Sequence, residues 1–261
     1  METAVAAKDL VLALRGERAA RPRVDPTLAG GLRAWLEDDL ALSVADVAPS
    51  APLFLSPRTI IEGASQGSTP TLALARGALV GALVAQRLSL GDVEHPMDDA
   101  LSALEADPSQ RELVSSIHQL DPDGFARLAA EVAAHDTVLA HSLGAIPSSW
   151  LPRTNVRLSV PLVGGRVVLG AVVNVMLGPP ASTVSTVCLL DVTTAELTDT
   201  VHARLGVLAL IEALRSAAPP LRVATLSTAT GDVAMLDVDD ALLTTALRHV
   251  VTAADQHQGA N

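Results

Sequence analysis

Apolar and polar residues follow two different periods along this chain. In the first 145 residues the apolar positions recur every three or four residues, as they do on one face of an α-helix. After Pro147 the spacing falls to two, which is typical of half-buried β-strands. The sequence therefore predicts a helical N-terminal portion followed by a region that contains a sheet.

Prolines and short polar stretches divide the helical portion. Pro22 and Pro26 separate the first two helices, and the three prolines within residues 48–57 predict a linker. The longest apolar helix has Pro70 in its first turn and Thr69 or Thr71 as its cap. The predicted helices cover residues 4–14, 28–42, 70–90, 97–105, 109–119 and 124–143.

The second portion predicts a mixed sheet with a helix between its strands. A three-stranded meander turns at Gly164-Gly165, and a later helix starts at Asp239 or Asp240. The order of elements indicates an α/β fold in which helices flank a mixed sheet. The strands are predicted at 156–162, 166–177, 184–192, 221–228 and 233–238, and the helices at 198–216 and 239–254. We expect helical segments at 1–50 and 51–147, an α/β core at 148–255 and a disordered tail at 256–261.

Length and composition favour one domain with elaborations, or one domain with a small helical one. Of the 261 residues 49% are apolar but only 2% are aromatic, so Ala, Val and Leu must build the core. Arg76 and Asn174 interrupt the longest apolar stretches, which stay below the roughly 20 residues of a membrane span. No basic leader precedes an apolar segment at the N-terminus, so we expect a cytoplasmic protein.

The charge of the chain bears on its partners. The net charge is −11, and residues 1–150 hold 20 acidic and 11 basic residues. Binding to a phosphate backbone needs clustered Lys and Arg, so this balance disfavours a stand-alone nucleic-acid-binding protein. Arg153, Arg157 and Arg166 form one basic group on adjacent predicted strands, with Arg157 and Ser159 on the same face. Surface arginines are the favoured interpretation, and a vestigial phosphate site is the alternative.

Candidate metal ligands and nucleophiles are sparse. Cys188 is the single cysteine, which excludes an internal disulfide and a Cys-rich metal centre, and its strand context predicts burial. His135 and His141 lie six residues apart on one predicted helix, so they face different sides and are expected to face solvent. Asp121 lies in a turn that lacks the later ligands of a calcium loop. We expect neither a metal nor a cofactor.

The segment from Gly63 to Gly67 matches the G-x-S-x-G pattern of α/β-hydrolases, with Ser65 in the nucleophile position. A nucleophile elbow stands between a strand and a helix. The preceding 50 residues predict helices, and only residues 59–62 could form a strand. A loop of small residues is therefore the favoured interpretation of this segment.

Two stretches carry a resemblance to a known family. They read RTNVRLSVPLVGGRVVLGAVVNVMLG and VCLLDVTTAELTDTVHARLGVLALIEALRSAAPPLRVAT. In phrase order and spacing they resemble the RecB-like branch of the PD-(D/E)XK nuclease superfamily. The resemblance covers about residues 153–250, with a weaker match at Arg76-Gly77. It implies a restriction-endonuclease-like fold and, in active relatives, metal-dependent cleavage of DNA.

The positions to which the resemblance assigns catalysis are mostly changed. Asn174 stands where the family has its first metal-binding Asp, and a neutral amide brings no charge to hold a divalent cation. Asp191 is kept, but Thr193 replaces the lysine two residues later. The resemblance also places Gly81 at the helix position of a His and Leu208 at that of a Tyr.

Lys8 is the only lysine of the chain and lies far along the sequence from these positions. In the family a lysine positions the attacking water and stabilises charge on the phosphate. We therefore expect a catalytically inactive nuclease-like protein with no metal, acting as a protein-interaction subunit in a DNA-processing or defence assembly. Its acidic N-terminal helices would bind a protein partner or a second copy. The alternatives are a nucleic-acid-binding module without cleavage, an active metal-dependent nuclease and a serine hydrolase.

Overall fold

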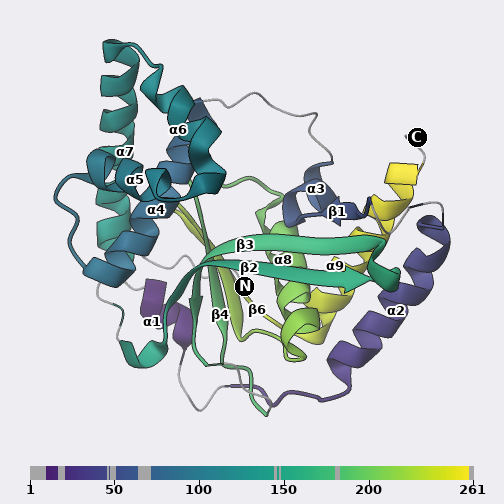
Figure 1. Cartoon of the computed structure of the whole chain (residues 1–261). Coiled ribbons are helices and arrows are strands. Elements are labelled where there is room, and N and C mark those ends of the chain that lie inside the picture. Colours follow the sequence, from purple (N-terminus) through teal and green to yellow (C-terminus); the bar gives the residue numbers. More distant parts are fainter. Residues whose placement is uncertain are drawn as a thin grey trace.

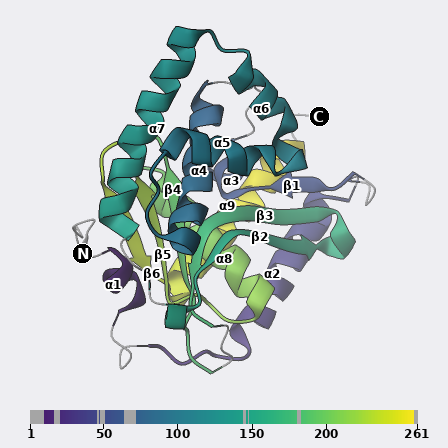
Figure 2. The same cartoon turned by 60° about the vertical axis from the view of Figure 1, so that its left-hand side comes forward.

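The fold is described from a computed structural model of the chain (Figure 1). It describes residues 10–16, 21–45, 47, 51–63, 72–143, 146, 148–179 and 183–258. Within these ranges a six-stranded mixed sheet carries helices on both faces (Figures 1 and 2). The predicted mixed α/β architecture is confirmed at this level.

The longest strand of the sheet, β3, has neighbours on both edges. One edge pairs with β2, antiparallel, along nearly all of its length. The other edge is shared by β1, which runs parallel at the start of β3, and β4, which runs antiparallel at its end. Beyond β4 the sheet continues with a parallel β5 and an antiparallel β6. The strands are β1 Leu53–Leu55, β2 Arg153–Leu162, β3 Val167–Leu177, β4 Cys188–Thr193, β5 Arg222–Ser227 and β6 Val233–Asp237.

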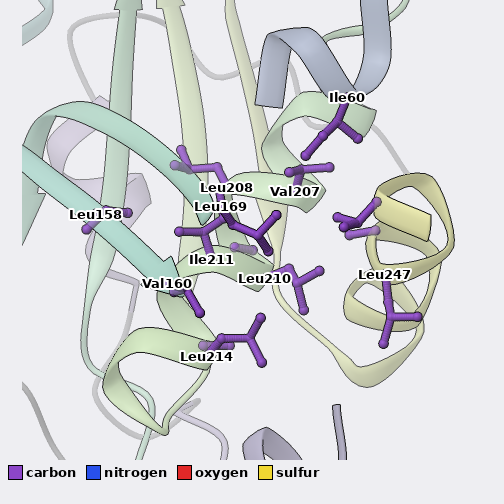
Figure 3. Close-up of a cluster of buried hydrophobic side chains, with 14 of the residues drawn as sticks. Ile60, Leu158, Val160, Leu169, Val207, Leu208, Leu210, Ile211, Leu214 and Leu247 are labelled. Carbon is purple, nitrogen blue, oxygen red and sulfur yellow. The ribbon is translucent and has the colours of Figure 1, made fainter. Parts of the chain in front are cut away.

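One face of the sheet is covered by α8, which is buried along most of its length. Figure 3 shows Leu208, Ile211 and Leu214 of α8 facing Leu158 and Val160 of the sheet. The opposite side of α8 packs on α9, so this helix forms the middle of the main core. The helices on this side are α2 Leu28–Ser43, α3 Pro57–Glu62, α8 Val201–Ser216 and α9 Asp240–Gln258.

The other face is partly covered by a helical lobe, residues 72–143, which has its own apolar core (Figures 1 and 2). The α-helices of the lobe are α4 Leu72–Leu90, α5 Pro96–Glu105, α6 Arg111–His118 and α7 Pro122–Leu143. The short α1 Leu10–Arg15 contacts α7 and β5. Single 3₁₀ turns, η3 Pro108–Gln110, η4 Ser148–Trp150 and η5 Val163–Gly165, complete the described helices.

Ion pairs fasten α4 to α7 inside the lobe. Arg87 binds both carboxylate oxygens of Asp136 at 2.6 Å, and the two side chains are only 13% and 7% exposed.

By length and composition, residues Leu72–Ser89 of α4 could cross a membrane, and about a third of that window is buried. In this fold α4 packs on α5, α7 and strands β2 and β3.

Several sequence predictions need correction. β1 lies in the predicted linker at 48–57, and residues 57–62 form helix α3 rather than a strand. α9 continues to Gln258, so residues 256–258 of the expected disordered tail are helical. The third predicted strand starts at Cys188, because Val184 makes only an isolated bridge with Arg23. Ser65, the caps at residues 69–71 and Lys8 lie outside the described residues.

Candidate functional site

The edge of β3 that is shared by β1 and β4 has a gap. Pairing with β1 ends at Leu169, and pairing with β4 begins at Val175, so residues 170–174 have no described strand partner on that edge. At the far end of the gap the Oδ1 atom of Asn174 accepts a hydrogen bond of 2.8 Å from the backbone N–H of Val192. The amide side chain thus links β3 and β4 where their backbones separate. It accepts the hydrogen bond of the Val192 N–H, which has no partner on the backbone of β3.

At Asn174 the regular alternation of β3 side chains between the two faces of the sheet is interrupted. Val173 belongs to the core under α8, whereas Val175 belongs to the core of the helical lobe. A regular strand would place both on the same face, because side chains alternate with a period of two. Asn155, which the β2–β3 register puts opposite Asn174, has a φ of 50°, a left-handed conformation that asparagine tolerates better than most residues. Two asparagines therefore mark the irregular point of the sheet.

A cavity of about 210 Å³ opens on the α8 side of the gap. Asp191 lies in its wall, with its Oδ2 atom 3.8 Å from Nη2 of Arg204, and Arg204 also contacts Glu62 at 3.5 Å. Burial raises the pKa of Asp191 to about 6, against the opposing effects of Arg204 and of the Val192 N–H. Asp191 is therefore held in a network of side-chain charges and is harder to ionise than an exposed Asp.

A second cavity, of about 570 Å³, lies on the lobe side of the same gap. Its floor is a face of α4 made of small residues, and a Cβ built at Gly81 would lie 3.5 Å from Nδ2 of Asn174. Val172 lines both cavities, so the two meet at the gap in β3. The other lining side chains on this side include Asp107, Gln110, Asn155 and Arg157.

Four of the five predicted vestigial residues come together at this gap. Gly81 and Asn174 line the lobe-side cavity, and Asp191 and Leu208 line the α8-side cavity. Thr193 lines neither. Its hydroxyl accepts a hydrogen bond from the N–H of Ala195, and its carbonyl accepts two from Thr228, one from the N–H and one from the hydroxyl. Thr193 thus stabilises the end of β4.

The three predicted arginines do not form one group. Arg157 lines the lobe-side cavity, and it is exposed on the face that Ser159 shares, as the alternation predicts. Arg153 binds the carbonyl of Gly178 at 3.2 Å, at the opposite end of β2 from Arg166. Ten strand residues span about 30 Å, so one phosphate cannot contact all three side chains.

The other sequence candidates have local roles. Cys188 is buried as predicted, and burial raises the pKa of its thiol to about 11. Oδ1 of Asp121 accepts the N–H of Gly124 at 2.7 Å, which confirms a turn at the start of a helix. His141 is exposed, but His135 is buried, so the expectation that both face solvent is wrong for His135.

Sequence reasoning missed Arg204 and Asn155 at this site. Arg204 lies four residues before Leu208 on α8, which puts both on the same helix face. That spacing could have indicated Arg204 once Leu208 was placed near Asp191. Asn155 had no such signal, because its left-handed backbone depends on pairing with β3.

The site does not fit the divalent cation that the nuclease resemblance implies. The neutral oxygen of Asn174 already uses one lone pair on the Val192 N–H, and Asp191 shares Arg204 with Glu62. Among the described residues, no group of three or more His, Cys, Asp and Glu side chains is placed to hold a metal ion. A hard cation needs several oxygen donors with negative charge, and this arrangement offers one carboxylate beside a guanidinium.

Comparisons with known proteins give no assignment: no protein-family model matches the chain, and no curated protein matches its sequence.

Proposed function

We propose that this chain is a catalytically inactive nuclease-like protein of the restriction-endonuclease-like fold. In this proposal it acts through protein interaction, as a cytoplasmic subunit of a DNA-processing or defence assembly. The support is a mixed sheet that brings Gly81, Asn174, Asp191 and Leu208 around one gap.

One observation carries the inactive part of the proposal. The hydrogen bond between Asn174 and Val192 uses the side-chain oxygen at the position where an active relative needs its first metal ligand. Neutral Asn brings no charge to that position, and the nearby Arg204 would repel a cation. The chain also has no lysine close in sequence to Asp191.

The charge distribution supports a protein partner over nucleic acid. The helical lobe, residues 72–143, contains eleven acidic residues and four arginines, two of which pair with Glu131 and Asp136. Arg157 and Asp107 line the lobe-side cavity, which thus holds one basic and one acidic side chain. This lining is not the cluster of Lys and Arg that a phosphate backbone needs.

A cleavage assay tests the proposal. The full chain is incubated with single- and double-stranded DNA and with RNA, in Mg²⁺ and in Mn²⁺, beside its Asp191→Ala variant. We expect no cleavage above the level of the variant. Cleavage by the wild-type chain that depends on the metal and is lost in Asp191→Ala would overturn the proposal.

A further inference from the structure

An open part of the sheet surface lies next to the helical lobe. Phe54 of β1 is 67% exposed and Val172 of β3 is 59% exposed. Leu53 and Leu55, on either side of Phe54, are buried in the core under α8, so Phe54 points to the opposite face. Val168 pairs with Phe54 on one side and with Pro161 on the other, which makes a continuous apolar row across three strands.

We call Phe54, Pro161, Val168 and Val172 the open sheet face. Val172 also lines the lobe-side cavity of about 570 Å³, so the open sheet face continues into this cavity, which we call the hollow. Helix α4 lines that hollow with two glycines and three alanines, together with two polar residues: Gly77, Ala78, Gly81, Ala82, Ala85, Gln86 and Ser89. Small floor residues leave room for one large side chain from outside.

The rim of this hollow carries charges of both signs, and the helical lobe around it is acidic. Asp107 lines it, and hydrogen bonds from the backbone and hydroxyl of Ser109 lower the pKa of this carboxyl, so it is charged at neutral pH. Glu105 and Glu112 flank the same connection between α5 and α6 and are exposed. The lobe as a whole has the excess of acidic residues noted above. Arg157 lines the same cavity, and its positive charge also lowers the pKa of Asp107, while the exposed Arg111 lies beside Glu112 in the chain.

We infer that the open sheet face and its hollow form a docking site for a short segment of a partner protein. The segment has a large apolar side chain that enters the hollow and Lys or Arg residues that meet the acidic residues of the helical lobe beside it. Exposed apolar surface beside a cavity and complementary charge are the features of a protein-interaction site. The inference rests on the proposed function, because it names the surface through which the inactive subunit would bind.

The test uses the full chain and a displayed library of random 16-residue peptides, with affinities measured afterwards by fluorescence anisotropy. Selected peptides should share a large apolar residue close to two or more Lys or Arg. Gly77→Leu fills the hollow, and a Cβ at Gly77 meets no atom within 4 Å, so the variant should fold. It should weaken binding at least about tenfold.

Gly30→Leu is the matched control, because Gly30 is also an exposed helical glycine with no atom within 4 Å of its Cβ, and it lies on α2. Gly30→Leu should leave the affinity unchanged. Asp107→Asn should weaken binding about threefold and reduce its dependence on salt.

Three results would overturn the inference: no selected binder, binders without the apolar-and-basic pattern, or equal binding by Gly77→Leu. A single-stranded oligonucleotide that binds at the hollow and is displaced by Gly77→Leu would also overturn it, in favour of nucleic acid. The cleavage assay is independent of these results. Loss of the docking site with no cleavage leaves the inactive scaffold standing, whereas cleavage would remove the scaffold proposal even if peptides bind.

Discussion

The side-chain oxygen of Asn174 lies 2.8 Å from the backbone nitrogen of Val192 and accepts its hydrogen bond. The last backbone pair between β3 and β4 is Val175 with Leu190, and Asn174 is the next residue of β3 beyond this pair. The amide therefore extends the connection between the two strands after their backbones separate. The same contact uses one of the two lone pairs of a neutral oxygen, which makes this oxygen a weaker ligand for a cation.

Replacing Asn174 with Ala should destabilise the fold by about 1–3 kcal/mol, because the partly buried N–H of Val192 loses its acceptor. Chemical denaturation of both proteins measures this difference. Ser159→Ala, at an exposed position of β2, is the control and should change stability by less than about 0.5 kcal/mol. Equal stabilities for the two variants would show that the Asn174 contact contributes nothing.

Because of Asp191, the free energy of unfolding should depend on pH. Burial raises its pKa to about 6, while an unfolded Asp titrates near 3.9. Because the folded state holds the proton more tightly, the contribution of this group to stability is complete below about pH 4 and is lost as the pH rises through 6. Asp191→Asn, which stays neutral, should be more stable than wild type by about 1–3 kcal/mol at pH 8.

The two proteins should be nearly equal in stability at pH 4, so melting curves at pH 4 and pH 8 provide the measurement. Asp199→Asn, an exposed change on the approach to α8, controls for loss of one negative charge. A stability difference that grows toward low pH would contradict the assigned direction.

The Arg87–Asp136 ion pair joins α4 to α7 and should contribute strongly to the stability of the helical lobe. Asp136→Asn leaves a buried guanidinium without its counter-charge and should cost about 3 kcal/mol or more. Glu131→Gln changes the more exposed pair with Arg76, between the same two helices, and should cost less than about 1 kcal/mol. If urea denaturation gives the two variants the same stability, the buried pair does not have this role.

Cys188 should report unfolding through its reactivity. Its thiol donates to the carbonyl of Leu14, and burial raises its pKa to about 11, so the folded chain has little thiolate at pH 8. It is the single cysteine, so every labelled chain is labelled there. Labelling with a disulfide reagent should be slow and should reach the rate of a free thiol in denaturant. Fast labelling of the folded chain would contradict its burial.

The sequence was most informative where the periods were strong. The strands from β2 to β6 and helices α8 and α9 were predicted to within a few residues, because alternation and helical spacing extend over long runs there. β1 was missed because Leu53–Leu55 is three residues long and lies between prolines. Its partner, the start of β3, is more than 100 residues away in the sequence, so no local pattern indicates the pairing.

Burial of His135 could have been predicted from helical spacing. Leu128, Val132 and Leu139 are buried on α7, and His135 falls on the same face at a spacing of three or four residues. The link between Asp191 and Arg204 could not be read from the sequence with equal ease, because it depends on how α8 packs on the sheet. The gap in β3 is likewise a product of tertiary pairing.

The most direct test of the central claim is Mn²⁺ binding to the purified chain at pH 7.5, measured by electron paramagnetic resonance and compared with the Asp191→Ala variant. Because Asn174 is engaged by Val192 and Asp191 lies beside Arg204, we predict that the two proteins bind Mn²⁺ equally weakly up to millimolar concentration. A tighter site in the wild-type chain that disappears in Asp191→Ala would contradict the account.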